Sequence, residues 1–355
     1  MFRMILAAAL AVMLSHIPAQ AAPRDARLVL VTLDGVPWTE VFKGADPARA
    51  ADRAFVNEIG LVKKDFLDPA DRAQALAPFL NSVMAKQGVL LGDRDNGSCM
   101  AVGNDQWFSY PGYNELLTGK PDPAIRSNSH GPNANVTVLE WLNRQPGFRG
   151  KVQAYGSWEA FHDILNAPRS GVPVNAGWDD GGDARLGRLQ AETPRLWPVE
   201  RFDAFTHLLA LDALKSRAKP RVLYIAYGDT DEFAHEGHYD QMLWAIRRTD
   251  AFLAELWKTL QADPTYAGKT TLIVTTDHGR GVGNRESWRH HGKGAFARSD
   301  ETWLAAMGPD VVPGAGPAEC GKLGQVAATA LTALGLDWKA FDPTAGAPLP
   351  ILRGR

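Results

Sequence analysis

The chain has 355 residues, of which 45% are hydrophobic and 22% are charged, and its formal net charge at pH 7 is −2. These values are ordinary for a globular protein that buries a substantial core. The nearly balanced charge gives no reason to expect a nucleic-acid partner.

The first residues predict export. Arg3 precedes an apolar run at residues 5–14, and Ala19-Gln20-Ala21 supplies the small-residue pattern of a cleavage site. We therefore expect a signal peptide over residues 1–22, a single domain over residues 23–355, and a periplasmic or secreted location. The apolar run is shorter than the roughly 20 residues that a membrane-spanning helix needs, and no later run is longer, so no membrane span is expected.

Strands and helices alternate along the rest of the chain. Short runs that are apolar at every position predict strands at residues 28–33, 222–227 and 271–276, and residues 151–155 predict a fourth, weaker strand. An apolar stripe predicts a helix over residues 241–260, and an alanine-rich segment predicts another over residues 321–334. The pattern predicts an α/β fold, a three-layer α/β/α sandwich with a largely parallel central sheet.

An acidic residue follows each of the three strongest strands. Asp34 follows the first strand and precedes Gly35, which lets the backbone come close to whatever the carboxylate holds. A solvated or capping aspartate is the alternative for this position taken alone. In parallel sheets, ligands bind beyond the carboxyl ends of the strands, where these acids fall.

The second strand leads into a segment that pairs a carboxylate with an imidazole. Asp231 and His235 are four residues apart and share one face of a helical turn. Both side chains are suitable ligands for a dication such as zinc. The alternative is a surface turn capped by Asp229, and His238 is a competing ligand with a poorer spacing.

The third strand ends in the most specific motif, Asp277-His278-Gly279, and His291 follows thirteen residues after His278. Adjacent aspartate and histidine side chains reach one ion only if the backbone turns sharply, which Gly279 permits. His290 is the alternative to His291.

The ordered set of these residues resembles the metal ligands of the alkaline phosphatase superfamily. The set consists of Asp34, Asp231, His235, Asp277, His278 and His291. Between its first two members, residues 109–119 resemble the start of the nucleophile helix in the type I phosphodiesterase and nucleotide pyrophosphatase branch. The resemblance therefore implies that Ser109 is a nucleophile.

The resemblance also implies two divalent metal ions, for which the ligand types favour zinc. One ion would be held by Asp34, Asp277, His278 and the Ser109 oxygen. The other would be held by Asp231, His235 and His291. The implied activity is hydrolysis of a small-molecule phosphoric monoester or diester through a phosphoseryl intermediate at Ser109.

Two departures from the family patterns bear on the substrate. The phosphodiesterase branch has an asparagine where this chain has Gly112, so Asn114 and then Arg280 are the candidates to contact the substrate. Sulfatases need an arginine at the position of Tyr113, which argues against that activity. Other residues near the motifs that could bind a leaving group or a phosphate oxygen are Trp107, Tyr113, Trp158, His162 and Lys293.

Three alternatives stay open beside the hydrolase: a phosphomutase or other transferase on the same core, a sulfatase, and a metal-binding protein without turnover. The oligomeric state is also open. Cys99 and Cys320 are the only cysteines. An oxidising compartment would permit a disulfide between them, and two buried thiols are the alternative.

Overall fold

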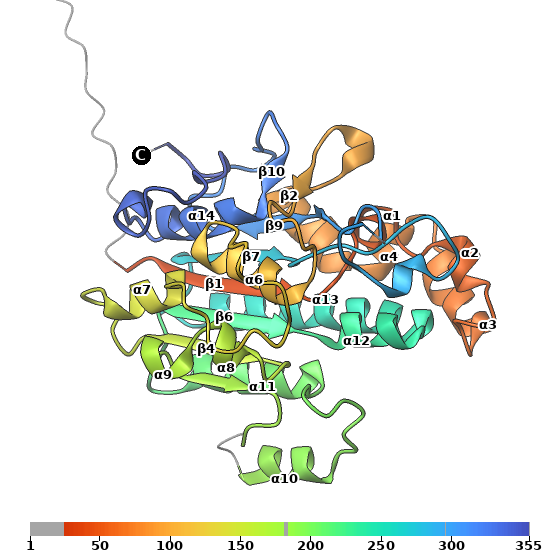
Figure 1. Ribbon diagram of the computed structural model, residues 1–355, viewed down its shortest axis with the longest axis horizontal. Coiled ribbons are helices and arrows are strands. Elements are labelled where there is room, and N and C mark those ends of the chain that lie inside the picture. The colour runs from red at the N-terminus through yellow and green to blue at the C-terminus, as the bar shows by residue number, and fades with distance from the viewer. Residues whose placement is uncertain (1–24, 181–183, 295, 355) are drawn as a thin grey trace, which may run out of the picture.

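The computed structural model describes residues 25–180, 184–294 and 296–354, so the predicted signal peptide lies outside the described residues. A seven-stranded sheet forms the centre, in the order β2-β9-β7-β1-β6-β4-β5 (Figure 1). Its strands are β1 (Arg27–Leu33), β2 (Val89–Leu91), β4 (Val152–Gly156), β5 (Val174–Ala176), β6 (Val222–Tyr227), β7 (Thr270–Thr275) and β9 (Leu304–Met307).

The sheet is largely parallel, as predicted. The strands β7, β1, β6, β4 and β5 are parallel neighbours, and β9, near one edge, is antiparallel to both of its neighbours, β7 and β2. The four strands expected from the sequence occur within one residue of their expected bounds. Every residue of β6 and β7 is buried, because helices cover both faces of the sheet.

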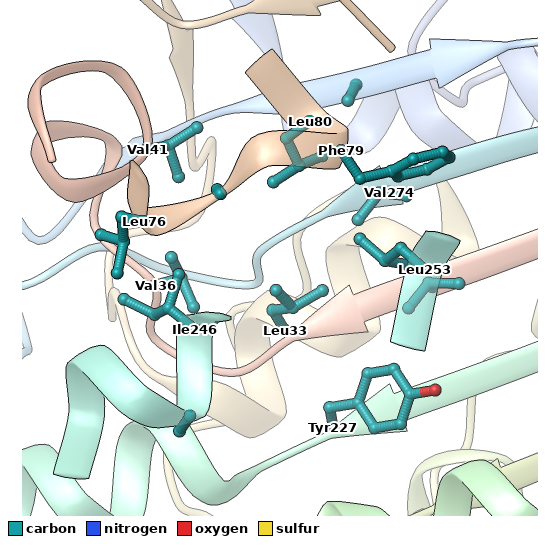
Figure 2. Packing of buried hydrophobic residues seen from close by; sticks show 14 of the residues in the cluster. Leu33, Val36, Val41, Leu76, Phe79, Leu80, Tyr227, Ile246, Leu253 and Val274 are labelled. Carbon is teal, nitrogen blue, oxygen red and sulfur yellow. The ribbon is translucent and has the colours of Figure 1, made fainter. Parts of the chain in front are cut away.

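One face packs against the first of two hydrophobic clusters. The helices on this face are α1 (Trp38–Lys43), α4 (Arg72–Leu76), α11 (Asp203–Lys215), α12 (Asp229–Glu236) and α13 (Tyr239–Ala262). Figure 2 shows Ile246 and Leu253 of α13 close to Leu33 of β1, with Tyr227 of β6 and Val274 of β7 beside them. The predicted helix over residues 241–260 is the central part of α13.

The other face packs against α6 (Ser109–Thr118), α7 (Val138–Arg144), α8 (Phe161–Ile164) and α14 (Val326–Ala333). Two cores on one sheet confirm the predicted three-layer α/β/α sandwich. The second predicted helix begins later than expected, because Gly321 and Lys322 form β10 and pair with β3 (Met100–Ala101).

The remaining α-helices and one remaining short strand lie around these layers. They are α2 (Pro47–Ala50), α3 (Ile59–Val62), α5 (Ala85–Gln87), α9 (Ala167–Ser170), α10 (Ala184–Glu192) and β8 (Glu301–Thr302). A disulfide joins Cys99 to Cys320 next to the β3 and β10 pair, which resolves the open question about the two cysteines. Within the described ranges, none of the helices combines the length and the apolar character needed to span a bilayer.

Candidate metal centre and nucleophile

The predicted ligands converge because three neighbouring parallel strands end at the same edge of the sheet. β1 lies between β7 and β6 (Figure 1). Asp34 directly follows β1, Asp231 lies in the first turn of α12 after β6, and Asp277 lies two residues beyond β7. The structure thus brings together residues that are more than 240 positions apart in the sequence.

His278 is at the centre of one group of possible ligands. Its Nε2 lies 3.2 Å from Oδ1 of Asp34, 3.4 Å from Oδ2 of Asp277 and 3.3 Å from the Ser109 hydroxyl oxygen. Its Nδ1 lies 2.9 Å from the Gly279 carbonyl oxygen, which can accept a hydrogen bond only if Nδ1 carries a proton. This hydrogen bond therefore places the proton on Nδ1 and leaves a lone pair on Nε2, the ring atom that faces the carboxylates.

The second group surrounds Asp231. Its Oδ2 lies 3.0 Å from Nε2 of His235, one helical turn further along α12. Its Oδ1 lies 3.7 Å from Nε2 of His291, and the two histidine Nε2 atoms are 3.0 Å apart. The sequence left His290 and His291 as alternatives, and His291 is the one that lies next to the Asp231 carboxylate.

The ionised carboxylates of this cluster are buried close together, which is electrostatically unfavourable without a bound cation. Burial and the nearby Asp231 carboxylate raise the pKa of Asp34 well above its usual value. Burial and the Asp34 carboxylate likewise raise the pKa of Asp277. Oδ1 of Asp34 and Oδ2 of Asp277 accept no hydrogen bond from the described residues. Dications would satisfy these oxygens and offset the repulsion, so the donor set fits metal binding.

The histidine beside them is in the form that a metal needs. Burial and the neighbouring His278 ring hold the pKa of His291 well below its usual value, so its imidazole is neutral at pH 7. For Asp231, burial acts to raise the pKa, but Arg280 and the two histidines outweigh it and hold the pKa well below normal. Asp231 is therefore a carboxylate at neutral pH.

Ser109 is the first residue of α6, and its hydroxyl faces the His278 group. The close approach of α6 explains the glycine that departs from the family pattern. A Cβ on Gly112 would lie 2.5 Å from the carbonyl oxygen of Asp277, too close for any other side chain.

Just before the helix, Trp107 has a left-handed φ of 59°, held by hydrogen bonds to Asn104. The sequence contains no signal for this strained residue.

Asn114 and Arg280, the two predicted substrate contacts, have different surroundings. Asn114 is completely buried, and its Oδ1 accepts hydrogen bonds from Asn133 and Asn135, so its side chain is used within the protein. Arg280 does lie at the cluster. It forms an ion pair with Asp231 and donates to the carbonyl oxygens of Gly35 and Arg289.

Tyr113, which the sequence suggested only as a possible pocket residue, contacts one of the predicted metal ligands. Its hydroxyl donates a hydrogen bond of 2.9 Å to Oδ2 of Asp34. The spacing from Ser109 was the available signal, because residues four apart share one face of a helix. Thr230 also contacts this strand end, donating to the Asp34 carbonyl oxygen at 2.5 Å.

A family model matches the part of the chain that carries most of the candidate ligands. The family model described as type I phosphodiesterase / nucleotide pyrophosphatase matches residues 134–307, which include Asp231, His235, Asp277, His278 and His291. No curated protein sequence matches the chain.

Solved structures show the same fold at low sequence identity. A protein in the alkaline phosphatase superfamily from Vibrio parahaemolyticus superposes with a TM-score of 0.55 at 14% identity, covering 92% of this chain and 70% of that one. The C-terminal periplasmic domain of EptC from Escherichia coli, in complex with zinc, gives 0.54 at 12% identity, covering 93% and 88%. The lipoteichoic acid synthase LtaP from Listeria monocytogenes gives 0.53 at 10% identity, covering 88% and 72%. Residues 134–307 therefore match the type I phosphodiesterase / nucleotide pyrophosphatase family, and the chain shares its fold with a solved structure from the alkaline phosphatase superfamily.

Proposed function

We propose that the protein is an exported hydrolase of phosphoric monoesters or diesters that uses two divalent metal ions, zinc by ligand type, and Ser109 as its nucleophile. The observation that carries the proposal is the position of the Ser109 hydroxyl. It lies 3.3 Å from the Nε2 lone pair of His278, within a group of acids and histidines whose buried oxygens lack partners. The match of residues 134–307 to this family and the fold shared with the superfamily support an enzyme that acts on phosphate or sulfate esters.

The proposed ligand groups are those that the resemblance implies: Asp34, Asp277, His278 and Ser109 would hold one ion, and Asp231, His235 and His291 would hold the other. In support, the ligand atoms of Asp34, Asp277 and His278 lie close enough to share an ion, as do those of Asp231, His278 and His291, and His235 adjoins Asp231 and His291. Bound dications would supply charge stabilisation and a lower pKa for the serine hydroxyl.

The chain's own residues perform the group transfer. The Ser109 Oγ attacks phosphorus as its proton passes to solvent water, and the bond from phosphorus to the leaving oxygen breaks as that oxygen takes a proton from water. Water then attacks the phosphoserine and gives up one proton to solvent. The bond from phosphorus to Oγ breaks, and Oγ takes a proton from solvent, which restores the hydroxyl. Placement of Oγ at the first turn of α6 helps, because the amino end of a helix favours negative charge.

Arg280 and Tyr113 would position two of the ligands. Arg280 is ion-paired with Asp231 and is otherwise bonded to backbone carbonyls, so its role in this proposal is to orient that carboxylate. Tyr113 orients Asp34 in the same way. Because Tyr113 is buried against Asp34 at the position where sulfatases need an arginine, we favour phosphoric over sulfuric esters.

Export is part of the proposal and has separate support. The disulfide between Cys99 and Cys320 is typical of proteins in an oxidising compartment, which agrees with the signal peptide expected from the sequence.

A substrate panel tests the function. The metal-replete protein is assayed with p-nitrophenyl phosphate, bis(p-nitrophenyl) phosphate and p-nitrophenyl sulfate, before chelation, after chelation, and after zinc is restored. We expect turnover of at least one phosphoric ester that is lost with the metal and recovered with zinc. Turnover of the sulfate ester alone, or activity that survives complete metal removal, would contradict the proposal.

A further inference from the structure

A buried carboxylate on the nucleophile helix is bonded to two other parts of the chain. Glu115 lies on α6, six residues after Ser109, and is 1% exposed. Its Oε2 accepts hydrogen bonds from the backbone amide of Asn104 at 2.7 Å and from the side-chain Nδ2 of that residue at 3.0 Å. Its Oε1 accepts from the backbone amides of Gly103 at 2.8 Å and Gly324 at 3.1 Å. Burial raises the pKa of Glu115, and these N–H donors act against that rise because they favour the charged carboxylate.

The loop that Glu115 holds leads directly into the proposed nucleophile. Oδ1 of Asn104 accepts hydrogen bonds from the backbone amides of Gln106 at 2.9 Å and Trp107 at 3.1 Å. These bonds hold Trp107 at its left-handed φ of 59°, a backbone conformation that costs energy for any residue other than glycine. Ser109 follows two residues later, so the turn at Trp107 sets the direction in which the chain enters α6.

The same loop contacts the segment that carries a proposed metal ligand. The carbonyl oxygen of Gln106 accepts a hydrogen bond of 3.0 Å from the backbone amide of Lys293, two residues after His291. The Nζ atom of Lys293 also lies 5.9 Å from the centroid of the Trp107 ring. The loop at residues 103–107 is therefore joined both to the nucleophile helix and to the segment of the second proposed ligand group.

A disulfide-linked pair of strands anchors the start of this loop. β3 ends two residues before Gly103, and it pairs with β10, which Gly324 follows closely. The disulfide between Cys99 and Cys320 joins the residues that precede these two strands. Because Glu115 accepts hydrogen bonds from both sides of this pair, it fastens the nucleophile helix to a covalently linked support.

We propose that Glu115 is a positioning residue for the reaction: by holding the loop at residues 103–107, it keeps the Ser109 oxygen and the His291 segment in the relative geometry that attack on phosphorus requires. This inference rests on the proposed function. The alternative is that the Glu115 carboxylate only stabilises the fold. The two roles differ in their kinetics, because a displacement of about 1 Å caused far from the reacting atoms can lower a rate about 100-fold.

Glu115→Gln tests this role with almost no change in side-chain shape. An amide nitrogen then faces backbone N–H donors, so the loop loses part of its attachment. We expect kcat per folded, zinc-replete molecule to fall about 10- to 100-fold with a KM near that of wild type, because the proposed metal ligands remain. An unchanged kcat in folded, zinc-replete Glu115→Gln would overturn the inference.

Asp250→Asn is the matched control for this variant. Asp250 is also a buried carboxylate that accepts hydrogen bonds from backbone amides, those of Phe79 and Leu80, but it lies on α13, on the opposite face of the sheet. We expect this variant to change the unfolding free energy and to leave kcat at the wild-type value. An equal fall in kcat in Asp250→Asn would show that any weakened fold slows turnover, and would also contradict the positioning role.

A second variant breaks the same connection one step closer to Trp107. Asn104→Ala removes the oxygen that accepts the amides of Gln106 and Trp107, while Glu115 keeps its bonds to Gly103 and Gly324. We expect a similar fall in kcat, so this variant decides the question even if Glu115→Gln does not fold. Because both changes act through one loop, the double variant should lose less than the product of the two single losses. A wild-type kcat in Asn104→Ala, or a loss in the double variant equal to that product, would count against the inference.

Hydrogen exchange separates this inference from the proposed function. Exchange of backbone amides is measured by mass spectrometry on zinc-replete wild type and Glu115→Gln. We expect peptides that span residues 103–108 and 291–294 to exchange at least about tenfold faster in the variant, while α13 keeps its protection. Unchanged protection at residues 291–294 would show that the loop does not join the two segments, whatever the turnover. If wild type hydrolyses no phosphoric ester, the proposed function fails, and the exchange result still decides whether Glu115 joins them.

Discussion

The hydroxyl of Tyr113 lies 2.9 Å from Oδ2 of Asp34 and donates a hydrogen bond to it. The other oxygen of this carboxylate, Oδ1, faces the Nε2 lone pair of His278 at 3.2 Å. In the proposed metal site, Tyr113 would thus leave Oδ1 as the oxygen of Asp34 that binds the ion. Both residues are buried, so no solvent competes for this hydrogen bond.

Removal of that hydroxyl should weaken metal binding without unfolding the protein. We expect Tyr113→Phe to lower zinc affinity by about 10- to 100-fold, as changes to the partners of metal ligands generally do. Competition with a chromophoric chelator measures the affinity. Tyr110→Phe is the matched control. Tyr110 lies on the same helix as Tyr113, but its hydroxyl donates to the carbonyl oxygen of Gly131, away from the proposed metal ligands. Equal zinc affinities for wild type and Tyr113→Phe would show that Asp34 needs no such support.

The histidines of the second ligand group give a prediction about metal content. We expect His235→Ala to reduce bound zinc from about two ions per chain to about one, because the variant leaves only Asp231 and His291 in that group. Elemental analysis after gel filtration measures the content. His238→Ala is the control, since that side chain is half-exposed and lies 3.9 Å from Glu236. Full zinc content in His235→Ala, or a loss in His238→Ala, would contradict the assignment.

The raised pKa of Asp250 leads to a prediction of how the unfolding free energy depends on pH. Burial raises the pKa of Asp250 to about 6, against an ordinary value of 3.8, although its carboxylate accepts hydrogen bonds from the amides of Phe79 and Leu80. Between these two values the folded state holds a proton that the unfolded state releases. The contribution of Asp250 to stability is therefore full at pH values below the pKa of the unfolded state, and it is lost as the pH rises through the pKa of the folded state.

The loss corresponds to about 3 kcal/mol between about pH 4 and about pH 7. We expect the unfolding free energy of wild type, relative to that of Asp250→Asn, to fall by this order over that interval. Urea unfolding at several pH values measures it. Asp68→Asn, at an exposed position, should give a difference from wild type that does not change with pH in this way. A difference for Asp250→Asn that is constant or rises with pH would refute the prediction.

Most of the fold, and the convergence of the candidate ligands at one edge of the sheet, could be predicted from the sequence for one physical reason. Strands buried on both faces are continuous apolar runs, so their ends are legible, and parallel neighbours place those ends at one edge. Asp34, Asp231 and Asp277 could therefore be placed together without knowledge of the loops. The pairing of Cys99 with Cys320 could not be predicted, because β3 and β10 are two residues long and leave no hydrophobic pattern.

Features that depend on the direction of a side chain could not be predicted from the sequence. Asn114 is close to Ser109 in sequence, but its amide is bonded to Asn133 and Asn135, which lie in a loop with no recognisable pattern. Gly112 departs from the family pattern at a position where the backbone of Asp277 leaves no room for a side chain. In both cases the deciding contact comes from a distant part of the chain.

The central claim is that the Ser109 oxygen attacks phosphorus, and the zinc-replete Ser109→Ala variant tests it most directly. Turnover of the best phosphoric ester and zinc content are measured side by side in this variant and in wild type. The account predicts a loss of turnover of at least about a thousandfold with nearly unchanged zinc content, because the histidines and carboxylates remain in place. Wild-type turnover by Ser109→Ala would contradict it.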